Sequence, residues 1–224
     1  MLQGATNVGG NFLQTFGGMY GVIVAFAIYV TWGQHNETQV AVEREAVILA
    51  QLYRVLGWFA SWPDRSTVRD RLLGYARAVP LSNGDPKALA LASDHQLLDQ
   101  SLAVFLRHTP SAPAEERLHS TALNLFHDLN VAREHRITVS GLRLPEGLRW
   151  FVFIGGAITV VSMELLWVES VVMQSVLVAF LTWVVVAAAS IMIDLDDPYT
   201  GDFCVDWNRF HEAARLMEAT QCTA

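Results

Sequence analysis

Hydrophobic and polar positions divide the chain into three long apolar runs and one polar region with helical patterning. The apolar runs, which contain little or no charge, occupy residues 12–32, 150–168 and 171–193. Because about 20 mostly apolar residues span the hydrocarbon core of a bilayer, each run predicts a transmembrane helix. We therefore expect an all-α integral membrane protein with three transmembrane helices.

The polar region between the first and second runs predicts a helical domain. Apolar residues recur at helical spacing after residue 40 and nothing breaks the pattern before Gly57, so the first helix should continue out of the membrane as one rod. Turn residues delimit further helices over 64–79, 86–108 and 114–139. The expected organisation is an N-terminus with the first transmembrane helix (1–32), an inserted helical domain (33–147), a transmembrane hairpin (148–193) and an acidic C-terminal tail (194–224).

Basic residues predict the orientation. All 15 Lys and Arg residues lie between the first and second runs or after the third. Basic residues close to membrane spans stay on the cytoplasmic side. We therefore expect a multi-pass protein of the plasma (inner) membrane with an outside N-terminus, a cytoplasmic middle domain and a cytoplasmic tail. The N-terminus before the first run has no Lys or Arg, so that run is expected to be a retained helix rather than a signal peptide.

Composition and motifs narrow the class of function. The net charge of −7 and the lack of a basic patch argue against nucleic acid as a partner. The two cysteines, Cys204 and Cys222, do not have zinc-ligand spacing, and no nucleophile elbow or phosphate-binding glycine loop is present. The sequence thus gives no argument for an enzyme, and membrane lipids are the first expected partner.

Small residues form one face of the first run. Gly17, Gly21 and Ala25 are four residues apart, which is the spacing that allows close helix packing in lipid. The face predicts either a subunit or pore interface or ordinary packing within the chain, and the sequence favours neither.

Aspartates cluster directly after the third run. Five of them fall between Asp194 and Asp206, and carboxylate oxygens are the ligands that hard cations such as calcium prefer. The spacing is not that of an EF-hand loop. The favoured alternative is a helix exit whose carboxylates face water or pair with Arg133, Arg136 or Arg143.

Three stretches of the chain carry a family resemblance. They are Tyr20-Gly21 with Trp32, His35-Asn36-Glu37, Arg44-Glu45-Ala46 and Leu52-Tyr53-Arg54; Leu123-Asn124 with Arg133, Arg136, Pro145 and Trp150; and Asp194-Leu195-Asp196-Asp197-Pro198-Tyr199-Thr200-Gly201-Asp202. In order and spacing the chain resembles the bestrophin-like group of bacterial integral membrane proteins. That group is named for its similarity to true bestrophins, which are pentameric anion channels with a calcium site after the last span.

The resemblance implies a homo-oligomeric anion channel, with small ions and further copies of the chain as partners. It makes Phe16, Tyr20 and Phe26 candidate pore-lining residues. It also makes calcium the one candidate cofactor, with Asp196, Asp197 and Asp202 as its ligands. The alternative is a non-conducting membrane protein whose cytoplasmic helical domain binds a partner or organises an assembly. The near absence of charge in the three spans favours this alternative.

Overall fold

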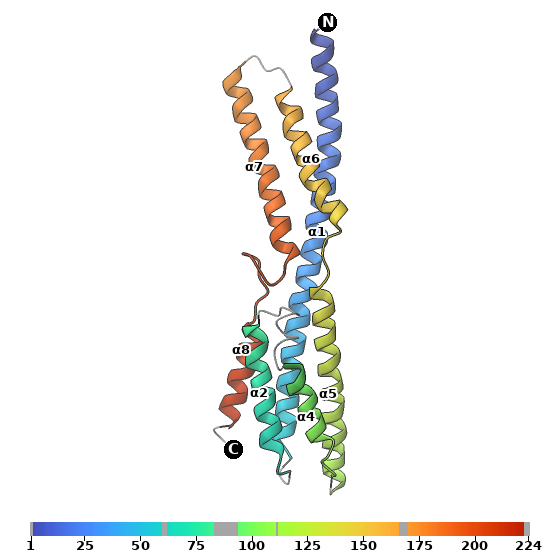
Figure 1. Ribbon diagram of the computed structural model, residues 1–224, viewed down its shortest axis with the longest axis vertical. Helices are drawn as coiled ribbons and strands as arrows, with labels where there is room; N and C mark the ends of the chain where they lie inside the picture. Colours follow the sequence, from blue (N-terminus) through green and yellow to red (C-terminus); the bar gives the residue numbers. More distant parts are fainter. Residues whose placement is uncertain (1, 60–61, 83–93, 111, 166–169, 222–224) are drawn as a thin grey trace. The chain divides into compact units, whose positions relative to one another are not determined.

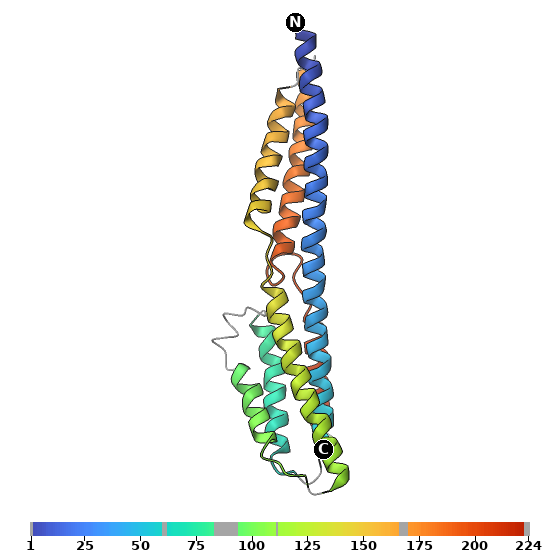
Figure 2. The same ribbon diagram turned by 90° about the vertical axis from the view of Figure 1, so that its right-hand side faces the viewer.

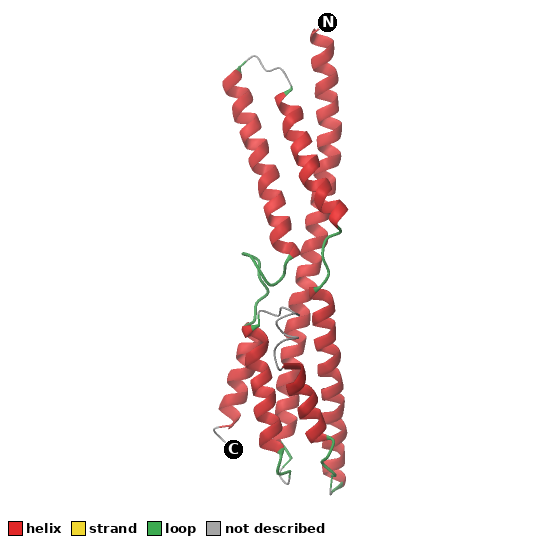
Figure 3. Cartoon of the chain, in the orientation of Figure 1, coloured by secondary structure: helices red, strands yellow, loops and turns green. Residues whose placement is uncertain are grey.

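Helices make up the regular structure of the described residues (Figures 1 and 3). The computed structural model describes residues 2–59, 62–82, 94–110, 112–165 and 170–221. Its helices are α1 (Leu2–Gly57), α2 (Arg65–Leu81), α4 (Asp94–Phe105), α5 (Pro113–Ser140), α6 (Glu146–Glu164), α7 (Val171–Asp196) and α8 (Asn208–Gln221). The prediction of an all-α protein is confirmed for these residues.

Three of these helices are long and apolar enough to cross a membrane. They are the Gln14–Gly57 part of α1, α6 and α7, whose most apolar windows have mean hydropathies of 1.5, 1.3 and 2.6. The prediction of three candidate membrane helices is thus confirmed. The prediction that the first run continues as one helix to Gly57 is also confirmed.

The chain divides into two compact units. Unit 1 comprises Met1–His35 and Leu142–Cys204, and unit 2 comprises Asn36–Gly141 and Val205–Ala224. Unit 1 contains the apolar helices α6 and α7, whereas α2, α4, α5 and α8 belong to unit 2.

In unit 1, α6 and α7 run beside the first part of α1 in both views (Figures 1 and 2). The residues of α1 that face them, Tyr20, Val24 and Ala27, are four and three positions apart and buried. They pack in one cluster with Val152 of α6 and Met192 of α7. One face of α1 therefore holds the three helices of unit 1 together.

Two glycines of α6 permit close helix contacts in unit 1. A Cβ atom on Gly155 would lie 2.7 Å from Cδ2 of Tyr20. A Cβ atom on Gly156 would lie 2.5 Å from Cγ1 of Val185 on α7. Real Cβ atoms do not approach other carbon atoms this closely, so both positions require glycine for α1, α6 and α7 to pack as they do.

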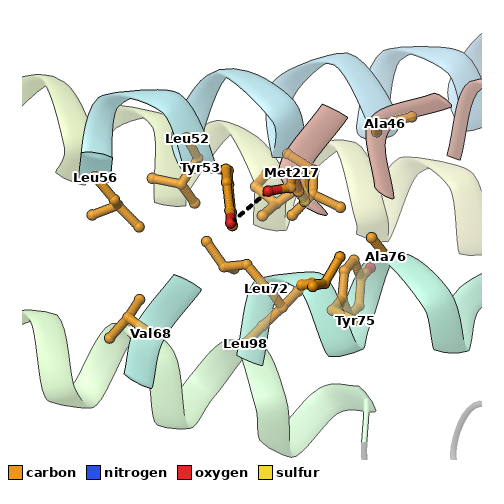
Figure 4. Packing of buried hydrophobic residues seen from close by; sticks show 14 of the residues in the cluster. Ala46, Leu52, Tyr53, Leu56, Val68, Leu72, Tyr75, Ala76, Leu98 and Met217 are labelled. Atoms are coloured by element: carbon orange, nitrogen blue, oxygen red, sulfur yellow. Dashed lines mark hydrogen bonds between the residues drawn. The ribbon is translucent and has the colours of Figure 1, made fainter. Parts of the chain in front are cut away.

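Unit 2 is built around a continuous hydrophobic core (Figure 4). Leu52 and Leu56 of α1 and Leu72 of α2 are fully buried there. The hydroxyl of Tyr53 donates a hydrogen bond of 2.9 Å to the backbone oxygen of Met217, which joins α1 to α8. Helix α8 packs on α2, so the buried face of α8 is part of this core.

Several helix boundaries differ from those that the sequence predicts. Helix α2 continues through Pro80 to Leu81, so the proline lies in its last turn and does not end the helix at residue 79. Helix α7 extends past residue 193 to Asp196, so the acidic stretch begins inside the helix. Helix α6 ends at Glu164. The helix start expected at residue 86 and Cys222 lie outside the described residues.

Candidate functional site

Asp196 anchors the end of α7 to the segment that leads into α6. Its side chain is only 9% exposed and accepts two hydrogen bonds, at 2.6 Å from the backbone N–H of Leu144 and at 2.5 Å from Nη2 of Arg149. Arg143 donates to the backbone oxygen of Asp196. The Asp196 carboxylate therefore links the C-terminal end of α7 to the N-terminal end of α6 within unit 1.

Asp197 lies in the turn after α7. Its carboxylate forms an ion pair of 3.2 Å with Arg143 and accepts a hydrogen bond of 3.3 Å from the backbone N–H of Tyr199. Partial burial alone would raise the pKa of Asp197, but hydrogen bonds from Thr200 and Tyr199 and the charge of Arg143 outweigh it, so the pKa lies below its usual value. Asp197 is therefore held in its ionised form.

The rest of the turn folds back on Asp194. The backbone N–H of Asp202 donates a hydrogen bond of 3.0 Å to Oδ2 of Asp194. Gly201 between them has a φ of +95°, and a Cβ atom there would lie 1.8 Å from Oδ1 of Asp194. Glycine is thus required both for its backbone conformation and for the space that it leaves.

These contacts bear on the metal site that the resemblance implies. Asp196 and Asp197 contact arginines, whereas Asp202 is exposed. Among the side chains that the structure describes, no three His, Cys, Asp or Glu residues are gathered to hold a metal ion. Calcium binding by these three aspartates stays a prediction.

The alternative that arginines pair with the acidic stretch is confirmed for Arg143. The other two arginines considered have carboxylate partners in unit 2. Arg133 pairs with Glu134 at 3.3 Å, and Arg136 pairs with Glu45 at 2.5 Å. Arg149, which the sequence argument did not consider, pairs with Asp196.

The three candidate pore-lining residues occupy different positions on α1. Tyr20 is buried in unit 1 and donates a hydrogen bond of 2.9 Å to the backbone oxygen of Val152. Phe16 is half-buried against the same cluster. Phe26 is 59% exposed. Of the three, only Phe26 presents most of its side chain outside the packing of unit 1.

Phe26 belongs to a row of exposed side chains, which we call the outer α1 stripe. It consists of Met19, Val22, Phe26 and Tyr29, between 59% and 73% exposed and spaced three, four and three residues apart. Positions with this spacing share one face of a helix. The stripe therefore lies on the side of α1 opposite the buried residues.

The small residues of α1 line an apolar groove in unit 1 of about 610 Å³, whose other wall is formed by α6 and α7. Apart from the backbone of α1 and the adjacent residues, no described atom lies within 4 Å of a Cβ atom built on Gly21, and Cγ2 of Thr159 lies 4.0 Å from one built on Gly17. Ala25 is exposed. Close helix packing at these positions stays a prediction, whereas Gly155 and Gly156 provide the close packing seen in unit 1.

Unit 2 contains a charge network that the sequence argument missed. Glu45 of α1 and Arg136 of α5 are fully buried, and Nε of Arg136 donates a hydrogen bond of 2.5 Å to Oε2 of Glu45. The Tyr75 hydroxyl of α2 donates to Oε1 of the same carboxylate. Burial and then the Glu45 charge hold the pKa of Tyr75 well above its usual range, so Tyr75 is a neutral donor. The sequence did contain a signal for this network, because Glu45 has helical spacing to the apolar residues Val42 and Leu49. All three side chains are buried.

Comparison with known proteins places these features in a family. A sequence model of the bestrophin-like domain matches residues 2–210, which is nearly the whole chain. The chain therefore belongs to the bestrophin-like family, and the resemblance read from its motifs is confirmed. The comparison with curated proteins found no match to this chain.

Solved structures share the fold at low identity. A leucine-to-threonine variant of a bacterial bestrophin homologue from Klebsiella pneumoniae has a TM-score of 0.77 and 11% identity over 93% of this chain and 86% of that one. Another structure of the homologue from the same organism has a TM-score of 0.76 and 11% identity over 92% and 85%. At such identities the likeness shows the fold alone.

Proposed function

We propose that this bestrophin-like membrane protein is a homo-oligomeric ion channel for anions, and that it has no catalytic activity. The outer α1 stripe is the observation that carries the proposal. It leaves Phe26 and its three neighbours uncovered, while the opposite face of the same helix is buried in unit 1. In a ring of copies, such a face can surround a central pore.

Side-chain exposure supports the choice of residues that the proposal assigns to the pore. Phe26 is retained from the three candidates, and Met19, Val22 and Tyr29 join it because they share its face. Tyr20 is assigned to helix packing, since its hydroxyl already donates to Val152.

The topology is part of the same proposal. Residues 33–147 form a cytoplasmic helical domain inserted between the first and second spans, and residues 194–224 lie on the same side. The distribution of all 15 Lys and Arg residues supports this orientation in the plasma (inner) membrane. Membrane lipids and small ions are the expected partners.

One observation favours the alternative, a non-conducting membrane protein whose helical domain binds a partner. The outer α1 stripe offers a single polar group, the hydroxyl of Tyr29, and is otherwise apolar. An apolar helix face can equally contact lipid.

Oligomeric mass and ion flux separate the two functions. Light scattering measures the oligomeric mass of the detergent-purified full-length protein with and without calcium. The protein is then reconstituted into vesicles, and chloride and potassium flux are measured. The channel requires a closed ring of several copies and a flux that empty vesicles lack. A monomer or dimer, or vesicles impermeable to every small ion tried, would leave the partner-binding alternative.

A further inference from the structure

A second feature of unit 2 has no role in the proposed channel. It is a pocket of about 340 Å³ between the C-terminal end of α1, α2 and α8. Its walls include Tyr53, Arg54, Trp58, Arg69, Leu216 and Met217. The volume is at the lower end of the range for small-molecule sites, about 300–1,000 Å³, so it suits a small molecule.

Arg69 gives this pocket its chemical character. The residue is 6% exposed, and its guanidinium lies over the ring of Tyr53, with Cζ 4.2 Å from the ring centroid. Its Nε and Nη2 atoms are buried and have no hydrogen-bond partner among the described residues. The carboxylate of the next residue, Asp70, instead accepts a hydrogen bond of 2.6 Å from the side chain of Gln221. A buried charge is costly without a counter-charge, and buried N–H groups without a partner usually indicate a missing ligand or water.

The other buried arginines of unit 2 differ from Arg69 in having a carboxylate partner, although Nε of Arg133 is also buried without a hydrogen bond among the described residues. Arg133 and Arg136 each contact a carboxylate, that of Glu134 and that of Glu45. No ion pair is found for Arg69 within the part of the chain that the structure describes. The pocket thus contains a buried cation whose counter-ion does not come from those residues.

The geometry of Arg69 selects the class of ligand. Nε and Nη2 form one edge of the guanidinium, and two parallel N–H groups on one edge match the two oxygens of a carboxylate or phosphate. Arg54, which is exposed, adds a second cation to the same pocket. Trp58 and Leu216, at 60% and 59% exposure, provide apolar surface beside these charges.

We propose that this pocket binds a small organic oxyanion, a carboxylate or phosphate monoester with a short apolar part. Arg69 holds the oxyanion, Arg54 adds charge at the rim, and Trp58 and Leu216 contact the apolar part. Because α1, α2 and α8 all contribute walls, the bound anion stabilises the docking of α8. This ligand site is independent of ion conduction by the outer α1 stripe.

Thermal unfolding of the full-length protein in detergent tests the proposal with benzoate and phenyl phosphate as probes. The neutral isostere benzamide is the ligand control. A ligand that binds only the folded state raises the unfolding temperature with concentration. At least one of the two anions should raise it saturably, whereas benzamide should not. If neither anion does so, or if benzamide does so equally, the proposal is wrong.

Three variants locate the binding. Arg54→Gln changes an exposed residue, so the protein should fold and bind the anion about tenfold or more weakly. Arg69→Lys keeps the charge but lacks the paired N–H edge, and should lose most binding. Arg77→Gln is the matched control, because Arg77 lies on α2, is exposed and pairs with Glu218 outside the pocket. Unchanged binding in Arg54→Gln, or an equal loss in Arg77→Gln, would overturn the assignment.

Discussion

The buried pair of Glu45 and Arg136 makes a quantitative prediction about the stability of unit 2. Both side chains are at 0% exposure, and they belong to α1 and α5. Arg136→Met removes the guanidinium but keeps a long side chain in the same space. It leaves the Glu45 carboxylate buried and, of the two hydrogen bonds that the structure describes for it, keeps the one from the Tyr75 hydroxyl.

The expected loss follows from the cost of a buried charge without its counter-charge. Breaking a buried ion pair by removing one partner typically costs about 3–5 kcal/mol. For a domain of the size of unit 2, that free-energy loss corresponds to a fall in the unfolding temperature of roughly 10–20 °C. The assay is thermal unfolding of the full-length protein in detergent, followed by circular dichroism at 222 nm.

A matched control comes from an exposed pair in the same unit. Arg77 and Glu218 are 2.6 Å apart, but their side chains are 57% and 46% exposed, so Arg77→Gln should cost no more than about 1 kcal/mol. The double variant Glu45→Met with Arg136→Met should be more stable than Arg136→Met alone, because neither charge is then left buried. The reasoning is refuted if Arg136→Met costs no more than Arg77→Gln.

Three further predictions concern unit 1. Gly156→Ala should lower the unfolding temperature strongly and Gly21→Ala should not. An added Cβ meets Val185 at 2.5 Å at the first position, whereas at the second no described atom beyond the helix backbone and the adjacent residues lies within 4 Å. Gly201→Ala should destabilise the protein in the same assay, because φ is +95° and the Asp194 carboxylate occupies the required space. Asp197→Asn should be less stable than the wild type at neutral pH, because folding lowers the pKa of this carboxyl. That difference is present above the unfolded pKa of about 3.9 and should vanish as the pH falls through the lower folded pKa, which unfolding from pH 7 to pH 2 measures.

Hydropathy and helical spacing predicted the helical class, the three apolar helices and the continuous helix that ends at Gly57. These features depend on local sequence, because length and periodicity decide them. Helix α8 could also have been found, since Phe210, Ala213, Ala214 and Met217 have the i, i+3, i+4, i+7 spacing of a buried face. The sequence interpretation treated residues 194–224 as an acidic tail and did not predict a helix there.

The contacts between side chains of different helices were much harder to predict from the sequence. Asp196 contacts Leu144 and Arg149, about 50 positions away in the chain, and Glu45 meets Arg136 from a different helix. Such pairings depend on how helices pack, which spacing along one helix does not determine. The same limit explains why Tyr20 was predicted to line a pore. Helical spacing along α1 does not show whether the face with Tyr20 contacts α6, as it does through Val152, or a pore.

Access to Phe26 in the working protein tests the central claim most directly. Phe26→Cys is introduced into a background with Cys204→Ser and Cys222→Ser, and the protein is reconstituted in planar bilayers. Phe180→Cys on α7, where Phe180 is 64% exposed, is the control for a lipid-facing site. A charged thiol reagent added from the aqueous phase should change the current severalfold in Phe26→Cys and leave Phe180→Cys unaffected. A current that the reagent does not change in Phe26→Cys, or no current in the unmodified protein, would contradict a pore lined by the outer α1 stripe.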